Sequence, residues 1–232
     1  MKRIAFVFDK MIYGGIERVG LTYIKGLSER GYSIDVYILD VNNVEDIVKE
    51  LPESVNVRMF KMSRRGVPAF ALRLAIKSNA AQYLLPFMKI GLSVIQLFQR
   101  VSFGKKVSYD CAIAFSGHMN DLTFVAAHFI DAPKRVAWLH GAQYGYYLMS
   151  PSYYELYKRF TNLVCLSDIL NNECEKAGYS QAALTSTKIY NPVRLPEYDK
   201  DNSSKIARTW GKYILVLGRI AHDKDPLTII RC

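Results

Sequence analysis

Short apolar runs alternate with helical patterns along most of the chain. The runs are rich in β-branched and aromatic residues, and between most of them the apolar positions follow the spacing of an amphipathic helix. Near-continuous apolar strands alternating with helices are typical of a parallel sheet covered on both faces. The pattern predicts a doubly wound, mostly parallel, Rossmann-like α/β domain, with strands at residues 3–8, 33–39, 55–60, 110–115, 135–140, 163–166 and 188–190.

Two helical regions stand out between these strands. The first follows the first strand and is expected to end before Gly31, since glycine is favoured just after a helix. The second, residues 68–103, is expected to hold two helical segments with Pro86 and Gly91 between or near them. Lys89 interrupts its longest apolar run, and the pieces are shorter than the ~20 residues that span a bilayer. We therefore predict no transmembrane helix here.

The composition changes near Pro192, where a polar stretch with proline, glycine and serine begins. Such a stretch is typical of an interdomain linker. It is followed by a strong apolar run and by Asp225-Pro226, a favourable helix start. One strand and part of a helix cannot bury a core. We expect a domain at residues 1–193, a linker at 194–211, and at 212–232 the truncated start of a second domain.

Positive charge is concentrated in one segment. The chain has 232 residues, half of them apolar, and a net charge of +10, which is the profile of a soluble globular protein. Residues 54–109 hold ten Lys and Arg and no Asp or Glu, so the whole excess belongs to them. A patch of this kind indicates a polyanionic partner: nucleic acid, an anionic membrane leaflet or a phosphorylated substrate.

Cysteine usage and the N-terminus suggest a cytosolic protein. The four cysteines form no C-x-x-C pair, which favours reduced thiols over a zinc site or a disulfide framework. The first apolar run breaks at Asp9, too early for a signal peptide. The four histidines are scattered, and neither an H-E-x-x-H motif nor a carboxylate cluster occurs, so no metal site is predicted.

Gly14 and Gly15 lie between the first strand and the first helix. Paired glycines let a ligand approach the backbone closely, and the free N–H groups of a helix start attract phosphate. The dinucleotide fingerprint G-x-G-x-x-G is absent. The sequence leaves two interpretations open, a phosphate-binding loop and a tight turn without a ligand.

Polar residues also follow two later strands. His140 ends one predicted strand, and His118 and Asn120 follow another. Ligands of open α/β sheets bind beyond the carboxyl ends of strands, so all three are candidates for substrate contact, with acid–base catalysis one possible role for His140. The alternatives are a structural histidine and, for Asn120 or Asp121, a helix cap. Near the C-terminus, Arg219 and Lys224 flank a strand-to-helix loop and form either a phosphate clamp or a solvated basic loop.

Several motifs occur in a familiar order: GGIERV, WLHG, VCLSD, IYNPV and VLGRIAHDKDP. The chain thereby resembles the N-terminal half of a family-four glycosyltransferase of the GT-B fold, over its whole length. The resemblance implies two Rossmann-like domains that face a cleft, transfer from a nucleotide-sugar with retention of anomeric configuration, and no cofactor or required metal. The family's carboxylate motif of two glutamates would lie beyond Cys232, so we expect the 232-residue chain alone to be inactive.

The resemblance also assigns roles to residues. Gly14 and Gly15 would contact the donor diphosphate, with Arg219 and Lys224 on its other side, and His140 would contact the transferred sugar as the catalytic residue. The acceptor pocket would be formed by Glu17, His118, Asn120 and Gln143. Similar enzymes use polyprenyl-diphosphate-linked acceptors in surface polysaccharide synthesis. The basic segment would then bind the inner face of the cell membrane, through Arg64, Arg65, Lys105 and Lys106.

Two other functions compete with sugar transfer. A lone acceptor domain would be a non-catalytic binding module for an acceptor or protein partner, used with a separate donor domain. A nucleic-acid binder is disfavoured, because Leu, Ile and Met interrupt the basic segment at helical spacing and no nucleic-acid-binding module is found. The sugar, the nucleotide, the acceptor and the oligomeric state are not specified by the sequence.

Overall fold

A computed structural model describes residues 1–63, 66–68, 85–104, 106–141, 152–176, 185–193, 216 and 225–231. The chain divides into two compact units, Met1–Pro192 and Val193–Cys232. The first unit holds a seven-stranded sheet in the order β3-β2-β1-β4-β5-β6-β7, with every neighbouring pair parallel. The doubly wound α/β fold is thereby confirmed. The strands are β1 (Arg3–Phe8), β2 (Ser33–Ile38), β3 (Asn56–Met59), β4 (Cys111–Ala114), β5 (Lys134–Leu139), β6 (Asn162–Cys165) and β7 (Thr185–Lys188).

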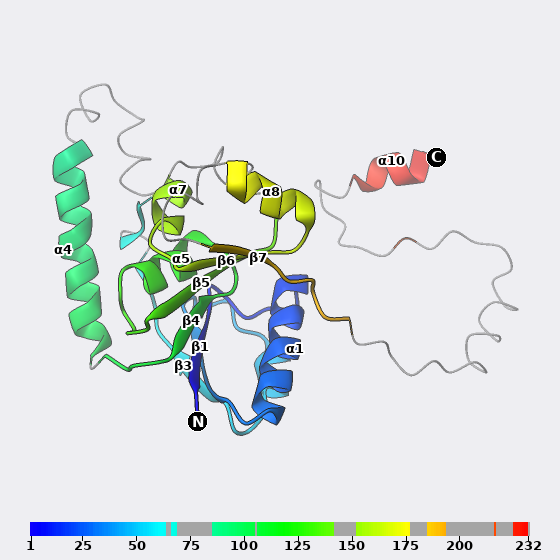
Figure 1. Cartoon of the computed structure of the whole chain (residues 1–232), viewed down its shortest axis with the longest axis horizontal. Coiled ribbons are helices and arrows are strands. Elements are labelled where there is room, and N and C mark those ends of the chain that lie inside the picture. Colours follow the sequence, from blue (N-terminus) through cyan, green and yellow to red (C-terminus); the bar gives the residue numbers. More distant parts are fainter. Residues whose placement is uncertain are drawn as a thin grey trace, which may run out of the picture. The chain divides into compact units, whose positions relative to one another are not determined.

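Helices connect these strands (Figure 1). The described helices are α1 (Gly15–Glu29), the 3₁₀ helix η1 (Asp46–Glu50), α4 (Leu85–Phe103), α5 (Met119–Ala126), α7 (Ser152–Tyr157), α8 (Asp168–Lys176) and α10 (Pro226–Arg231).

In the second unit, α10 begins at Pro226. The Asp225 carboxylate accepts hydrogen bonds from the backbone N–H and the hydroxyl of Thr228, as expected of a helix cap.

Most sequence-predicted boundaries agree with the structure, with two corrections. The last strand runs from Thr185 to Lys188, so the prediction at 188–190 was three residues late; the apolar pair Ile189-Tyr190 follows the strand. Gly91 lies inside α4 rather than between two helices, and Pro86 stands in the first turn of α4, where its missing N–H costs no helical hydrogen bond. The other predicted segment falls on residues 69–84, outside the described residues. The expected end of α1 is confirmed, since Gly31 adopts a φ of 80°.

The two faces of the sheet bury residues of different size. On β1, Ala5 and Val7 face the cluster that includes α5 and α7, whereas Phe6 and Phe8 face the cluster that includes α1. Small alanines on β4 and β5 continue the first face, and Phe115 and Trp138 continue the second. Because successive side chains of a strand point to opposite faces, one apolar run supplies both layers. Figure 1 shows α1 on one side of the sheet and α5 and α7 on the other.

Gly20 lets α1 approach the sheet closely. A Cβ atom at this position would lie 2.6 Å from Cζ of Phe8 and 3.0 Å from Cε1 of Phe115. Both rings are fully buried and pack against each other at a centroid distance of 5.3 Å. The rings therefore have little room to move, and the absence of a side chain at Gly20 sets the distance between α1 and β1.

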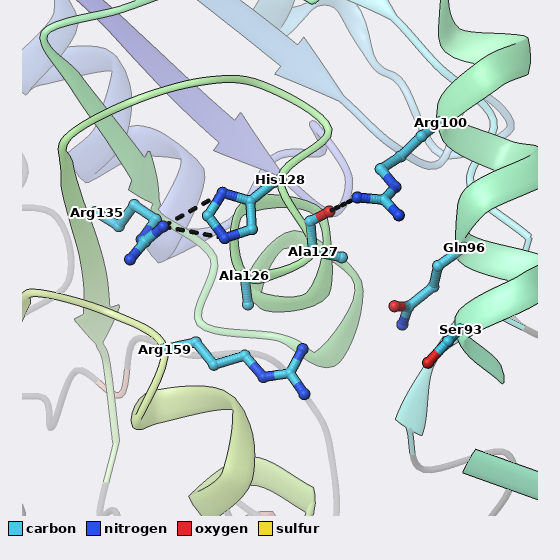
Figure 2. A pocket seen from close by; sticks show the side chains of 8 residues that line it. All are labelled: Ser93, Gln96, Arg100, Ala126, Ala127, His128, Arg135 and Arg159. Carbon is cyan, nitrogen blue, oxygen red and sulfur yellow. Dashed lines mark hydrogen bonds between the residues drawn. The ribbon is translucent and has the colours of Figure 1, made fainter. Parts of the chain in front are cut away.

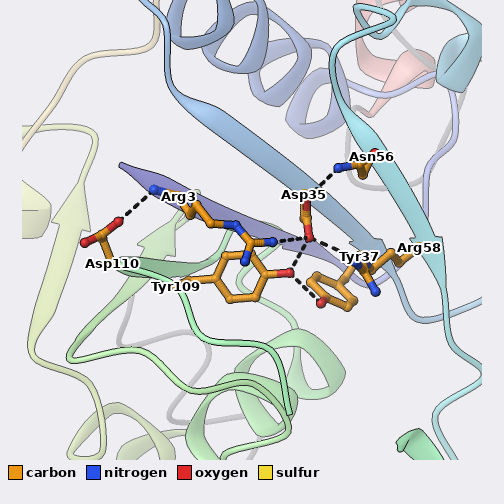
Figure 3. A network of polar contacts seen from close by, with 7 residues as sticks. All are labelled: Arg3, Asp35, Tyr37, Asn56, Arg58, Tyr109 and Asp110. Carbon is orange, nitrogen blue, oxygen red and sulfur yellow. Dashed lines mark hydrogen bonds and ion pairs between the residues drawn. The ribbon is translucent and has the colours of Figure 1, made fainter. Parts of the chain in front are cut away.

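Asp35 forms a buried polar network beside the first three strands (Figure 3). Its carboxylate is 1% exposed and lies 3.4 Å from the Arg3 guanidinium on β1 and 3.2 Å from that of Arg58 on β3. Tyr109 donates its hydroxyl proton to the same carboxylate, and Asn56 donates an amide N–H at 3.1 Å. Burial, and then the hydrogen bond to Asp35, raise the pKa of Tyr109, so its hydroxyl stays protonated.

We expect Gly20→Ala to lower the free energy of unfolding by about 1–3 kcal/mol, because an inserted methyl group overpacks the Phe8 and Phe115 rings. Gly26→Ala is the matched control in the same helix. A Cβ there meets nothing within 4 Å, so this variant should gain up to about 1 kcal/mol from helix propensity. Urea unfolding followed by circular dichroism measures both, and equal stabilisation by the two variants would contradict the close approach.

Candidate functional site

The candidate site lies at the carboxyl edge of the sheet. The strand order reverses between β1 and β4, and ligands of open α/β sheets bind where such a reversal occurs. The loop after β1 leads to Gly14, the loop after β4 leads to His118, and His140 directly follows β5. Because β1, β4 and β5 are parallel neighbours, the three loops open on one edge. The expectation of a common edge is confirmed.

Asp9 connects the first two loops. Its backbone N–H donates to Ser116 Oγ at 3.0 Å, and its carboxylate accepts from Asn120 Nδ2 at 2.6 Å. The second carboxylate oxygen lies 3.4 Å from Nδ1 of His118. Burial alone would raise the pKa of Asp9, but the hydrogen bonds from His118 and Asn120 outweigh it and the pKa is lowered. The hydrogen bond to Asp9 raises the pKa of His118, which favours an ion pair.

Asp121 anchors the start of α5 from within the protein. It is fully buried, and its carboxylate accepts the backbone N–H of Gly117 at 2.9 Å. Burial raises its pKa to about 7. Gly117 has a φ of 65°, and a Cβ there would lie 2.6 Å from the backbone oxygen of Trp138, so the turn requires glycine. Of the two capping candidates, Asp121 supports the helix start, and Asn120 instead contacts Asp9.

Gly14 and Gly15 differ in their surroundings. Gly14 is the N-cap of α1 and, as a glycine, has no side chain to cap the helix. A Cβ on Gly14 would lie 2.3 Å from Oε2 of Glu17, so the Glu17 carboxylate is folded back over the helix start. Glu17 is 4% exposed, and burial raises its pKa. A Cβ on Gly15 would meet nothing within 4 Å, so the Gly15 side of the loop is open.

His140 is held as a neutral imidazole. Its Nε2 lies 2.7 Å from the backbone oxygen of Phe115, which can only accept, so Nε2 carries the proton and Nδ1 is left as an acceptor. The ring also meets the Phe115 ring edge-on at 5.1 Å. Burial lowers the pKa of His140 to about 4. At neutral pH the residue therefore accepts a hydrogen bond and does not supply a proton as an imidazolium acid.

A cavity of about 480 Å³ adjoins Asn120. It lies at the carboxyl ends of β2 and β3, and Asn43 Nδ2 donates to the Asp40 carboxylate there at 2.7 Å. Sequence analysis missed this cavity and the role of Asp9, although Asp9 and Asp40 each follow a buried strand closely. The other lining residues are Leu39, Asn42, Lys61, Met62 and Ser63.

Other predicted site residues cannot be placed with these. Lys106 precedes β4, away from the carboxyl edge. No group of His, Cys, Asp or Glu that could hold a metal ion occurs within the described ranges. The predicted residues that lie outside the described part of the chain are Arg64, Arg65, Lys105, Gln143, Arg219 and Lys224.

Comparison with known proteins identifies related folds. No protein-family model matches the chain, and no curated protein does. Among solved structures, Anabaena Alr3699/HepE in complex with UDP and glucose matches with a TM-score of 0.56 and 17% identity, over 91% of this chain and 50% of that chain. The apo lipopolysaccharide outer core galactosyltransferase WaaB matches with a TM-score of 0.50 and 13% identity, over 85% of this chain and 50% of that chain.

The chain has the fold of half a GT-B glycosyltransferase. It spans about half the length of the two solved structures. The fold agrees with the resemblance inferred from the motifs, and the polar residues described above lie at the sheet edge where ligands of such folds bind.

The two histidines of the site should affect stability in different pH ranges, His118 above its ordinary pKa and His140 as the pH falls from 6.5 towards 4. In this lower range His140 is protonated in the unfolded chain but not in the folded protein, which lowers the free energy of unfolding of the wild type. His140→Gln lacks this effect, so its free energy of unfolding should fall by up to about 3 kcal/mol less. His118 has a raised pKa, and its protonated form stabilises the folded state at low pH. That stabilisation is complete below about pH 6.5 and is lost as the pH rises through the folded pKa, so above pH 6.5 the wild type should lose stability that His118→Gln does not lose. Urea unfolding at several pH values measures this, and parallel profiles would contradict it.

Proposed function

We propose that this chain forms the acceptor-side half of a glycosyltransferase that moves a sugar from a nucleotide-sugar to a glycan acceptor, with retention of anomeric configuration and no required metal. The observation that carries the proposal is the polar site at the strand-order reversal of a GT-B fold. One protein with this fold, HepE, was solved with UDP and glucose. The fold alone does not specify sugar transfer, and the chemistry of the site supports it further.

The site is suited to a diphosphate leaving group. Negative charge develops on a nucleoside diphosphate as the sugar leaves, and preorganised N–H donors stabilise such charge. Gly15 is exposed and a Cβ there would meet nothing within 4 Å, so a phosphate would approach the first-turn N–H groups of α1 from this side, away from the Glu17 carboxylate beside Gly14. Arg219 and Lys224 would bind the diphosphate from the second domain.

His140 would orient the transferred sugar. Its neutral ring offers Nδ1 as an acceptor while Nε2 is held by the Phe115 carbonyl. A sugar hydroxyl can donate to Nδ1, and the low pKa of His140 keeps this acceptor free of a proton at neutral pH. His140 would thus be a catalytic residue that contacts the sugar without transferring a proton.

The acceptor would bind beside Asp9. The cavity near Asn120 presents amide, carboxylate and hydroxyl groups, which match the hydroxyls of a glycan. Asn120, which lines the cavity, donates to Asp9, and the His118–Asp9 ion pair holds the loops after β1 and β4 together. His118, Asn120 and Glu17, together with Gln143, would form the acceptor pocket, and the buried Glu17 carboxylate would support the loop at Gly14.

A lipid-linked acceptor would place the protein on the inner membrane surface. The helix α4 carries an exposed apolar stripe at heptad-like spacing, in a segment with ten basic and no acidic residues. Exposed apolar side chains and surrounding cations together favour an anionic bilayer interface. Within the described ranges, no helix has the length and apolar character needed to cross a bilayer. The stripe consists of Phe87, Ile90, Val94, Leu97, Phe98 and Val101.

We expect the 232-residue chain alone to transfer no sugar from a panel of nucleotide-sugars to a lipid-linked acceptor, because the donor-side wall of the cleft would be missing. In a version that carries a complete second domain, His140→Ala should lower turnover by roughly 100-fold. Gly15→Ala should also lower turnover, because its Cβ would project into the space proposed for the phosphate. Gly26→Ala, in the same helix as Gly15, is the control and should retain full turnover. Product formed by the chain alone, or an unimpaired His140→Ala enzyme, would contradict the proposal.

Membrane binding should depend on the α4 stripe. Replacing Ile90, Leu97 and Val101 together by Ser should release the protein from anionic vesicles in a flotation assay, since buried apolar area drives insertion. Ile169→Ser on α8 changes an equally exposed side chain and should leave flotation intact. High salt should weaken binding. A second variant replaces four basic residues by Glu and should also be released: Arg64→Glu, Arg65→Glu, Lys105→Glu and Lys106→Glu. Unchanged flotation of either variant would refute the membrane role.

A further inference from the structure

A second cavity lies at the opposite edge of the sheet from the candidate site. It has a volume of about 430 Å³, within the usual range for small-molecule pockets. Arg135 is the second residue of β5, whereas His140 follows the end of that strand, so the cavity is at the amino end. Its remaining walls come from α4, from the end of α5 and from Arg159 after α7. The proposed sugar-transfer site does not use it.

Three arginines surround this cavity (Figure 2). Arg100, Arg135 and Arg159 come from three separate elements, and no Asp or Glu is found among the described lining residues. None of the three takes part in an ion pair within the described part of the chain. Asp131, whose charge reaches His128, is exposed and does not line the cavity. The three arginines therefore line the cavity with no acidic side chain among its described lining residues.

Two of these arginines keep buried donors unused. Nε of Arg100 and Nε of Arg135 are buried and have no hydrogen-bond partner among the residues that the structure describes. Arg100 donates through another nitrogen to the backbone oxygen of Ala127 at 3.3 Å. Leaving a buried donor without a partner is costly, so such groups are rare in native proteins. Both belong to side chains that line this cavity.

His128 shapes the wall beside Arg135. It follows the end of α5 and has a φ of 58°, a conformation that favours glycine. The backbone N–H groups of His128 and Phe129 close the helix end by donating to the backbone oxygens of Val125 and Phe124. The ring nitrogens of His128 lie 3.2 and 3.3 Å from Nη1 of Arg135. Burial, and then the Arg135 charge, lower the pKa of His128, so the ring is a neutral acceptor that holds Arg135 in place.

We propose that this cavity binds a phosphate group through Arg100, Arg135 and Arg159. Guanidinium groups bind phosphate oxygens in pairs of parallel hydrogen bonds, and three of them match the charge of a phosphomonoester or diphosphate. The ligand is either a soluble phosphate or a phospholipid head group. The second source is compatible with the site because Ser93, Gln96 and Arg100 lie on α4, the helix that carries the exposed apolar stripe.

Calorimetric titration of the chain with inorganic pyrophosphate tests the site without any sugar-transfer assay. The wild type should bind, and Arg135→Gln and Arg159→Gln should each weaken binding at least tenfold. Arg159 is exposed, so its variant should fold normally, as a thermal unfolding measurement would check. Arg30→Gln, an exposed arginine at the end of α1, is the control and should bind like the wild type.

Vesicle flotation distinguishes the two sources. Phosphatidylcholine vesicles with and without phosphatidic acid are compared for the wild type and for Arg159→Gln. A head-group site predicts that phosphatidic acid increases flotation of the wild type and that Arg159→Gln removes the increase; a soluble-ligand site predicts pyrophosphate binding with no such increase. The proposal is overturned if neither probe binds, or if Gly15→Ala abolishes pyrophosphate binding that Arg135→Gln and Arg159→Gln leave intact.

Discussion

The contacts of the buried Asp35 carboxylate link the strands on which the rest of the sheet is built. The carboxylate is buried on β2 and forms ion pairs with one arginine from β1 and one from β3. It also accepts a hydrogen bond from the hydroxyl of Tyr109, just before β4. Removing one partner of a buried charge is strongly destabilising, because the remaining charge stays desolvated. Asp35 therefore ties the first three strands to the start of the fourth. Since β1 and β4 are the strands at the order reversal, this network also fixes the elements that carry the candidate site.

The two edges of the sheet consequently carry different chemistry. The Asp35 network lies towards the amino ends of the strands, where ion pairs and hydrogen bonds join side chains of neighbouring strands. At the carboxyl edge, Asp9 performs a similar joining role between loops, but it is only partly buried and its partners His118 and Asn120 are also partly accessible. A side-chain network between strands together with accessible loops at the carboxyl edge is the arrangement that a binding site on loops requires.

The sequence was sufficient to predict the sheet because apolar runs dominate its strands. It was misleading at β7, because residues Thr185–Lys188 are polar and mostly exposed. The strand was therefore predicted at the apolar residues that follow, which include Ile189. The strand-end positions of Gly14, His118 and His140 were also predictable, since each follows an apolar run. Asp9 and the arginine cavity were not, because Asp9 bonds to Asn120, 111 residues away in the chain, and the three arginines of the cavity come from separate segments that meet only in the folded protein. A pairing of that kind leaves no periodic signal.

The basic segment at residues 54–109 shows how charge can be shared between the interior and the surface. Read as a stretch of sequence, its ten cations suggest one uniform polyanion-binding face. In the structure Arg58 pairs with the buried Asp35, and Arg100 lines the cavity at the end of α5. Arg58 therefore acts in folding, and Arg100 belongs to the proposed phosphate site rather than to a diffuse basic face. Because exposed charges are screened by salt and half-buried ones are screened less, the two groups should respond differently to ionic strength. Salt dependence thus separates a diffuse surface interaction from a specific pocket on the same segment.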